Sequence, residues 1–308
     1  MKVIFEPKIA EHDPSLYKSD KIATTINGWN AINEEVVRQY ERDGYLIVGN
    51  AYSDEEVDQA KKELSDMTLA DDPQCESIYY EGDIRGLIQL DQDEVRDNKG
   101  KQLAMGSFGE KLPDLPSKTR AAFVRKFMGF TEKHPPLGKL AYKPELLQLI
   151  STLTGVNDIE LFQEMAMIKP PGGREKPWHQ DHAYFNYPID TSIIGVWIAL
   201  GDVNEENGCM YLVPGMHKQG PILHFMRRDW QICDSEIYDT LAGKTVCAPM
   251  KAGDVLIFDS KLPHGTPKNK TNSYRWAVQL HYKGTRSKTW EDEQRLNIFG
   301  SEGKNVSC

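Results

Sequence analysis

Eight short runs of β-type residues, separated by turns, fill the chain from residue 160 to residue 282. These runs are 160–169, 178–181, 193–201, 210–213, 244–247, 255–258, 263–266 and 275–282. Turn-forming pairs such as Asn207-Gly208 and Gly253-Asp254 stand at the joints between runs. About eight strands with regular turns indicate a double-sheet jelly roll (double-stranded β-helix) of the cupin kind.

Helix signals dominate the part of the chain before these strands. Asn33 is a predicted N-cap, and Gly44 ends the helix that it opens. A short strand at 45–48 follows, and then Ser53 with Glu56 forms a capping box for a second helix. A third helix is predicted over 144–155. We expect these helices to pack on one of the two sheets.

The elements predict a single domain over residues 1–308, mainly β with flanking α. Its expected parts are a helical N-terminal part (1–155), a jelly-roll core (156–285) and a C-terminal tail (286–308). Residues 70–118 are polar and punctuated by Gly and Pro. Two interpretations of this segment stay open: a solvated insertion, or a lid that shapes substrate choice, since binding residues concentrate on loops.

Composition excludes several classes of function. The net charge of −9 argues against nonspecific binding of nucleic acid. The longest apolar run, 193–200, has the length of a strand and is far short of a membrane span. Five cysteines without CxxC spacing indicate reduced thiols, and no secretory or peroxisomal signal is found, so we expect a cytoplasmic protein. The oligomeric state stays open.

The segment Trp178-His179-Gln180-Asp181-His182 carries the strongest chemical signal. His179 and Asp181 stand two residues apart on a predicted strand, so their side chains point to the same side. A second imidazole would complete the two-His, one-carboxylate triad that holds Fe(II) and leaves coordination positions open. The candidate is His264, which follows another strand and a turn late in the β region.

Arg275 adds a second mark, because it opens the last predicted strand eleven residues after His264. A guanidinium suits bidentate binding of a carboxylate. If 2-oxoglutarate chelates the iron through its keto-acid end, its far carboxylate needs such a partner. A surface ion pair is the alternative interpretation of a lone arginine.

Taken together, these segments resemble the phytanoyl-CoA dioxygenase (PhyH) family of Fe(II)/2-oxoglutarate oxygenases. The resemblance runs from about residue 43 to residue 282. The pieces that carry it are Lys169-Pro170-Pro171, Trp178-His179-Gln180-Asp181-His182-Ala183-Tyr184-Phe185, Trp197-Ile198-Ala199-Leu200, Asn207-Gly208-Cys209-Met210, Pro214-Gly215-Met216-His217-Lys218, and His264-Gly265-Thr266 followed by Arg275.

The resemblance implies a double-stranded β-helix that uses Fe(II), 2-oxoglutarate and O2 to hydroxylate a C–H bond of a small molecule. Iron would be held by His179, Asp181 and His264, with Arg275 on the 2-oxoglutarate side chain. Further cosubstrate contacts are implied for Thr266, Trp197, Met165, Gln163 and Lys126. Because Asp181 is present, hydroxylation is favoured over halogenation, in which a small residue replaces the carboxylate.

The substrate is open: an acyl-CoA, an amino acid, a phosphonate and a terpenoid-like natural product all fit. His182, Arg174 and Tyr184 are candidate substrate contacts, and His281 is expected to be a packed strand histidine. Two other functions also stay open. One is a non-catalytic jelly-roll binding module, and the other is a cupin-like metalloenzyme that uses another divalent metal.

Overall fold

Two β-sheets form the centre of the protein, and a computed structural model describes residues 1–5, 11–87, 114–241 and 243–306. In these residues the large sheet has the strand order β1 (Lys2–Phe5), β4 (Ser77–Tyr80), β5 (Val124–Met128), β6 (Ile159–Lys169), β15 (Arg275–Gly284), β8 (Ile194–Ala199), β13 (Val255–Asp259), β3 (Tyr45–Gly49) and β2 (Thr25–Asn27). Its long central pair, β6 and β15, is antiparallel throughout.

The small sheet faces one side of the large sheet. Its order is β12 (Val246–Ala248), β9 (Met210–Leu212), β14 (His264–Thr266) and β7 (Lys176–His179). A separate ribbon pairs β10 (His224–Met226) with β11 (Trp230–Ile232). Buried side chains from both sheets form one apolar cluster, which includes Trp178, Trp197, Leu212 and Phe258. The predicted double-sheet jelly roll is confirmed.

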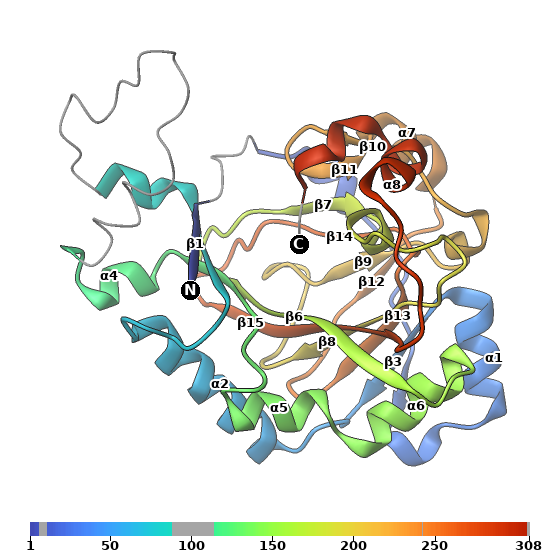
Figure 1. Cartoon of the computed structure of the whole chain (residues 1–308), viewed down its shortest axis with the longest axis horizontal. Helices are drawn as coiled ribbons and strands as arrows, with labels where there is room; N and C mark the ends of the chain where they lie inside the picture. The colour runs from blue at the N-terminus through green and yellow to red at the C-terminus, as the bar shows by residue number, and fades with distance from the viewer. Residues whose placement is uncertain (6–10, 88–113, 242, 307–308) are drawn as a thin grey trace.

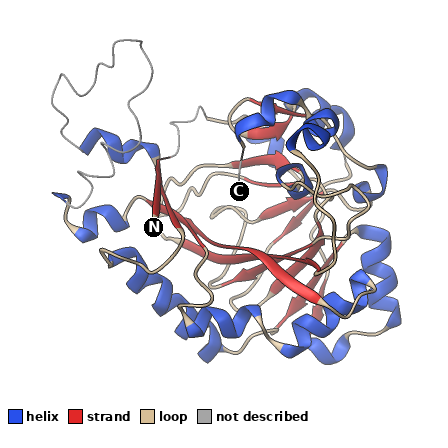
Figure 2. Ribbon diagram, viewed as in Figure 1, coloured by secondary structure: helices blue, strands red, loops and turns tan. Residues whose placement is uncertain are grey.

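Helices cover the opposite face of the large sheet. These are α1 (Glu34–Asp43), α2 (Asp54–Leu69), α5 (Pro135–Ala141) and α6 (Pro144–Thr154), which lie along the lower side of the sheet in Figures 1 and 2. A second apolar cluster joins them to the sheet through residues such as Leu64, Leu140 and Val278. The helices therefore pack on one sheet, as predicted.

The helix ends follow the capping signals of the sequence. The Asn33 side chain accepts from the backbone N–H of Val36, and Gly44 ends α1 in the left-handed region at φ 81°. Ser53 and Glu56 form a reciprocal capping box at the start of α2. Each cap satisfies backbone groups that a helix end leaves without partners.

The remaining elements connect or cover the two sheets. They are α4 (Ser117–Ala121), α7 (Asp234–Leu241) and α8 (Asp292–Phe299), with the 3-10 turns η1 (Pro14–Tyr17), η2 (Trp29–Ala31), η3 (Gly82–Leu87), η5 (Asp181–Tyr184), η6 (Met216–Gln219) and η7 (Ser301–Asn305). None of the described helices is long and apolar enough to cross a membrane.

Several details differ from the sequence predictions. Residues 77–80, inside the segment 70–118, form β4 of the large sheet, and residues 88–113 of the candidate lid lie outside the described residues. The expected C-terminal tail contains α8 and η7, which pack near β10. The ribbon β10–β11 and α7 were not predicted.

Candidate metal centre

His179 and His264 are brought together by strand pairing. His179 ends β7 and His264 begins β14, and the two residues are direct partners in the antiparallel register. Side chains at directly opposed positions of such a pair share one face of the sheet and stand close together. The ring centroids are 4.2 Å apart. The small sheet therefore supplies both imidazoles at neighbouring positions.

Asp181 reaches the same point from a turn, which corrects the prediction that it lies on the strand. β7 ends at His179, and Asp181 begins the 3-10 turn η5, closed by the N–H of Ala183 donating to the Gln180 carbonyl. Asp181 Oδ1 nonetheless lies 3.2 Å from His179 Nε2 and 3.5 Å from His264 Nε2. The prediction that the His179 and Asp181 side chains meet is confirmed, but the backbone at Asp181 is a turn and not the expected strand.

The three side chains present one ligand atom each around a common point. These atoms all lie within 4.8 Å of one another, and all three residues are buried. His179 Nδ1 contacts the carbonyl of Pro177 at 2.7 Å, and His264 Nδ1 contacts that of Leu262 at 2.9 Å. A carbonyl only accepts, so each Nδ1 carries the proton and each Nε2 lone pair faces the centre. The donor set fits a divalent transition metal.

Protonation also favours metal binding. Burial, together with the nearby His264, lowers the pKa of His179 to about 4. Burial acts to raise the pKa of Asp181, but its imidazole neighbours outweigh this and hold the pKa well below the ordinary value. Metal ligands must bind as neutral imidazole and carboxylate. His179 and Asp181 are in those states at neutral pH.

A buried basic site lies next to β14, the strand that begins at His264. Arg275 is 4% exposed, and its guanidinium lies over the Trp197 ring, 5.0 Å from the centroid. Its Nη1 makes one long bond, 3.5 Å, to the Gly208 carbonyl, and its Nε has no hydrogen-bond partner among the described residues. Burial lowers the pKa of Arg275 to about 10. A buried guanidinium with spare donors fits an anionic ligand.

Lys169 is a second basic residue at this site, and no sequence pattern singled it out. It is the register partner of Arg275, and its Nζ donates to Thr266 Oγ1 at 2.8 Å and to the Pro267 carbonyl at 2.6 Å. Burial, followed by the charge of Arg275, holds the pKa of Lys169 well below its usual value. A Cβ on Gly208 would lie 3.1 Å from Lys169 Nζ, so this glycine keeps space open.

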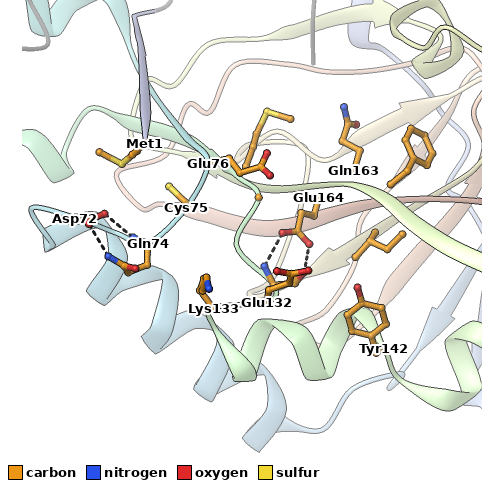
Figure 3. A pocket seen from close by; sticks show the side chains of 15 residues that line it. Met1, Asp72, Gln74, Cys75, Glu76, Glu132, Lys133, Tyr142, Gln163 and Glu164 are labelled. Atoms are coloured by element: carbon orange, nitrogen blue, oxygen red, sulfur yellow. Dashed lines mark hydrogen bonds between the residues drawn. The ribbon is translucent and has the colours of Figure 1, made fainter.

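The other residues implied for the cosubstrate lie on the same face of the large sheet as Arg275. Met165 and Trp197 are both register partners of Gln279, and Gln163 pairs with His281. Lys126 pairs with Met167, and its Nζ lies 3.9 Å from the centroid of the Tyr79 ring. Figure 3 shows Gln163 and Glu164 on opposite sides of β6; Glu164 bonds the backbone N–H of Thr131 at 2.7 Å.

The three candidate substrate residues lie in different surroundings. Tyr184 stands edge-on to the His179 ring at 5.7 Å, and its hydroxyl donates to the Trp230 carbonyl. His182 contacts Ser260 Oγ through Nδ1 and the carbonyls of Tyr187 and Pro188 through Nε2, so the protein occupies both ring nitrogens. Arg174 precedes β7, and its Nε lies 3.7 Å from Glu81.

Gln180 and His224 also support the metal site, and neither was singled out from the sequence. The backbone N–H of Gln180, between the candidate ligands His179 and Asp181, donates to His224 Nε2 at 3.0 Å. The Gln180 side chain donates to the carbonyls of Gly220 and Lys261. No local sequence pattern connects these segments, since they meet only in the folded chain.

A double-stranded β-helix with two imidazoles, one carboxylate and a buried arginine defines the class of non-haem iron oxygenases. The family description "Phytanoyl-CoA dioxygenase (PhyH)" matches residues 40–277. The chain belongs to this family, and it is a 2-oxoglutarate-dependent dioxygenase that uses iron.

Relatives match along most of the chain. The mouse peroxisomal phytanoyl-CoA dioxygenase is 22% identical, covering 99% of this chain and 82% of its own. Phytanoyl-CoA dioxygenase domain-containing protein 1 of Danio rerio is 24% identical, covering 87% and 95%.

Solved structures share the fold. EctD from S. alaskensis, crystallised with 2-oxoglutarate and 5-hydroxyectoine, superimposes with a TM-score of 0.59 at 22% identity, over 87% of this chain and 80% of its own. The α-ketoglutarate-dependent carbocyclase SnoK from nogalamycin biosynthesis gives 0.57 at 20% identity, over 85% and 88%.

Proposed function

We propose that His179, Asp181 and His264 hold the Fe(II) of this dioxygenase, which hydroxylates a C–H bond of a small molecule. The observation that carries the proposal is the convergence of three buried ligand atoms within 4.8 Å of one another. The carbonyls that fix each Nδ1 orient both rings before any metal arrives.

The cofactors supply the oxidation, and the protein supplies positions. When bound, Fe(II) and 2-oxoglutarate activate O2, with release of succinate and CO2 and insertion of one oxygen atom into the substrate C–H bond. Because the described residues offer three ligand atoms at the site, positions on the ion remain for the cosubstrates.

The buried pair Lys169 and Arg275 supports 2-oxoglutarate as the ligand beside the metal. Neither side chain has a carboxylate partner among the described residues, and burial disfavours the charged form of each. The distal carboxylate of 2-oxoglutarate would neutralise this charge, with Thr266 as a further donor. A cupin-like enzyme using another metal, or a non-catalytic module, gives no reason for such a pocket.

We place the substrate in a cleft of about 480 Å3 next to the metal residues, lined by residues that include Phe162, Gln163, Tyr184, Phe185 and Tyr187. Two of the lining residues connect this cleft to the metal centre. Tyr184 contacts the His179 ring, and the ring centroid of Phe185 lies 4.9 Å from that of His281. Four aromatic rings favour a flat or aliphatic part of the substrate near the iron.

Of the remaining candidate contacts, we assign Arg174 a role in binding an anionic part of the substrate. It lies in the loop between β6 and β7, and its side chain is largely buried. We assign His182 a structural role in η5, because both of its ring nitrogens contact protein groups.

We also propose that the protein works in the cytoplasm. The four cysteines that the structure describes are all free thiols, in agreement with a reducing compartment. Cell fractionation tests this, and recovery with peroxisomes would contradict it.

Anaerobic titration of the purified protein with Fe(II) and 2-oxoglutarate tests the function. We expect a visible metal-to-ligand charge-transfer band, and its loss in His179→Ala. Succinate release should then depend on a substrate and stop in the same variant. If the wild-type protein binds Fe(II) but never shows the band, the assignment of the 2-oxoglutarate site is wrong.

A further inference from the structure

We propose that Gln279 and His281 are positioning residues that restrict Asp181 to one-oxygen coordination of the metal ion. Both lie on β15 and reach across from the large sheet to η5. The inference rests on the proposed function for the identity of the metal, but it concerns side chains that do not touch the metal. We call these two residues the Asp181 clamp.

The two oxygens of Asp181 have different neighbours. Oδ1 faces the metal centre, 3.2 Å from His179 Nε2 and 3.5 Å from His264 Nε2. Oδ2 points the other way and lies 2.8 Å from His281 Nε2 and 3.1 Å from Gln279 Nε2. One oxygen is thus available to a metal while the other is occupied by the clamp.

The geometry assigns the protons of the clamp. Asp181 as a carboxylate only accepts, so His281 Nε2 and the Gln279 amide must both donate to it. His281 Nδ1 is buried and has no hydrogen-bond partner in the described part of the chain, and its ring centroid lies 4.9 Å from that of Phe185 and 6.2 Å from that of Phe162. Because Nδ1 faces aromatic rings, Nε2 is the ring nitrogen placed to donate to Asp181.

The clamp joins the two halves of the active site through one strand. Side chains alternate along a strand, so Arg275, Ala277, Gln279 and His281 share the inner face of β15. The same strand therefore carries the arginine for the cosubstrate and the two donors for Asp181. The two histidine ligands come instead from the small sheet. The clamp therefore connects the large sheet to the metal site through its contacts with Asp181.

A free carboxylate can chelate an ion through both oxygens. Chelation by Asp181 would add a fourth protein ligand atom and remove a position that O2 needs once 2-oxoglutarate binds through two atoms. Two N–H donors on Oδ2 disfavour this, because chelation would leave both donors buried and unpaired. The clamp therefore protects an open position as well as orienting the ligand.

The test measures metal binding rather than turnover. Apo-protein is titrated with Co(II), which reports coordination through its visible spectrum. We expect His281→Phe to weaken Co(II) binding about 10- to 100-fold, the usual effect of losing a hydrogen-bond partner of a metal ligand. His281→Gln, whose amide can replace the lost N–H, should restore most of the affinity and the wild-type spectrum.

The matched control is His134→Phe. His134 is also buried and also contacts a carboxylate, Glu63, at 2.7 Å, but it is the N-cap of α5, on the helical side of the large sheet. This variant should lose stability and keep the wild-type Co(II) affinity. Unfolding of each apo-protein is followed by circular dichroism, so that a folding defect is separated from a metal-site defect.

The outcomes are distinct. If His281→Phe folds and binds Co(II) with wild-type affinity and spectrum, the clamp is refuted while the proposed function stands. If His281→Phe does not fold, Gln279→Leu is measured instead. We expect it to weaken Co(II) binding as well, and an unchanged Co(II) affinity would refute the clamp. If the wild-type protein itself binds no Co(II) or Fe(II), the proposed function is wrong.

Discussion

Lys169 on β6 and Arg275 on β15 are direct cross-strand partners, and both cations are buried at 6% and 4% exposure. Like charges at opposed strand positions repel each other, and burial increases the effect. Such a pair is stabilised when an anion binds between the two groups. An anion bound here, where the cosubstrate carboxylate is expected, would favour the charged form of Lys169, whose pKa is lowered by burial and by Arg275.

We predict that Arg275→Ala raises the apparent KM for 2-oxoglutarate by about 10-fold or more, since hydrogen bonds between charged groups contribute ~1.5–3 kcal/mol. Lys169→Met should also raise the apparent KM for 2-oxoglutarate, and the change in kcat should be smaller than the change in KM. The control is Lys143→Met, which removes another partly buried lysine; Lys143 pairs with Glu56 on the helical side of the protein. Steady-state kinetics measure all three, and an unchanged KM in Lys169→Met would remove Lys169 from the site.

The capping box of α2 gives a prediction about stability alone. Ser53 accepts from the N–H of Glu56, and Glu56 accepts from the N–H of Ser53. Ser53→Ala should lower the free energy of unfolding by about 1 kcal/mol. Urea unfolding measures the loss, and the KM for 2-oxoglutarate should not change. A change in KM would mean that α2 is coupled to the active site.

The sequence predicted the parts of this protein that depend on short segments. The capping residues Asn33 and Ser53 act within four residues, and His179 with Asp181 lie within three. Strands of the core were found because turns separate them. The last strand, which begins at Arg275, was also placed correctly.

What the sequence did not predict depends on how distant strands pair. Lys169 becomes part of the anion pocket only because β6 pairs with β15 in one particular register. His281 was interpreted as a packing residue, although two-residue alternation from Arg275 already placed it on the inner face. Its partner Asp181 could not be assigned, since it lies on η5, a hundred positions earlier in the chain.

Stability should depend on pH through His224. Burial lowers the pKa of His224 to about 3, from 6.5 in the unfolded chain. The folded state therefore excludes a proton that the unfolded state accepts, so the stabilisation is complete above pH 6.5 and is lost as pH falls from 6.5 towards 3.

We predict that His224→Gln flattens this dependence in the apo-protein. One such group contributes at most ~1.4 kcal/mol per pH unit to the slope. The variant should be less stable than the wild type at pH 7.5, because Gln180 loses its acceptor, and the difference should shrink by pH 5. Urea unfolding at the two pH values measures this. A constant difference would show that His224 takes up its proton without unfolding.

Arg295 links the C-terminal helix to the turn that carries Asp181. It is 2% exposed, and it donates to Asn186 Oδ1 at 2.8 Å, to the Ala183 carbonyl at 2.9 Å and to the Gly303 carbonyl at 3.2 Å. Ala183 lies two residues after Asp181 within η5. The C-terminal segment is therefore expected to stabilise the metal site as well as the fold.

We predict that Arg295→Met lowers the free energy of unfolding by about 3 kcal/mol, because it leaves buried acceptors without their charged donor. Fe(II) affinity should also fall, since η5 loses its support from α8. Arg286→Met is the matched control: that side chain is 90% exposed and lies 3.9 Å from Asp158, so neither property should change. Urea unfolding and anaerobic Fe(II) titration separate the two effects. A loss of stability with unchanged Fe(II) affinity would show that η5 keeps its geometry without α8.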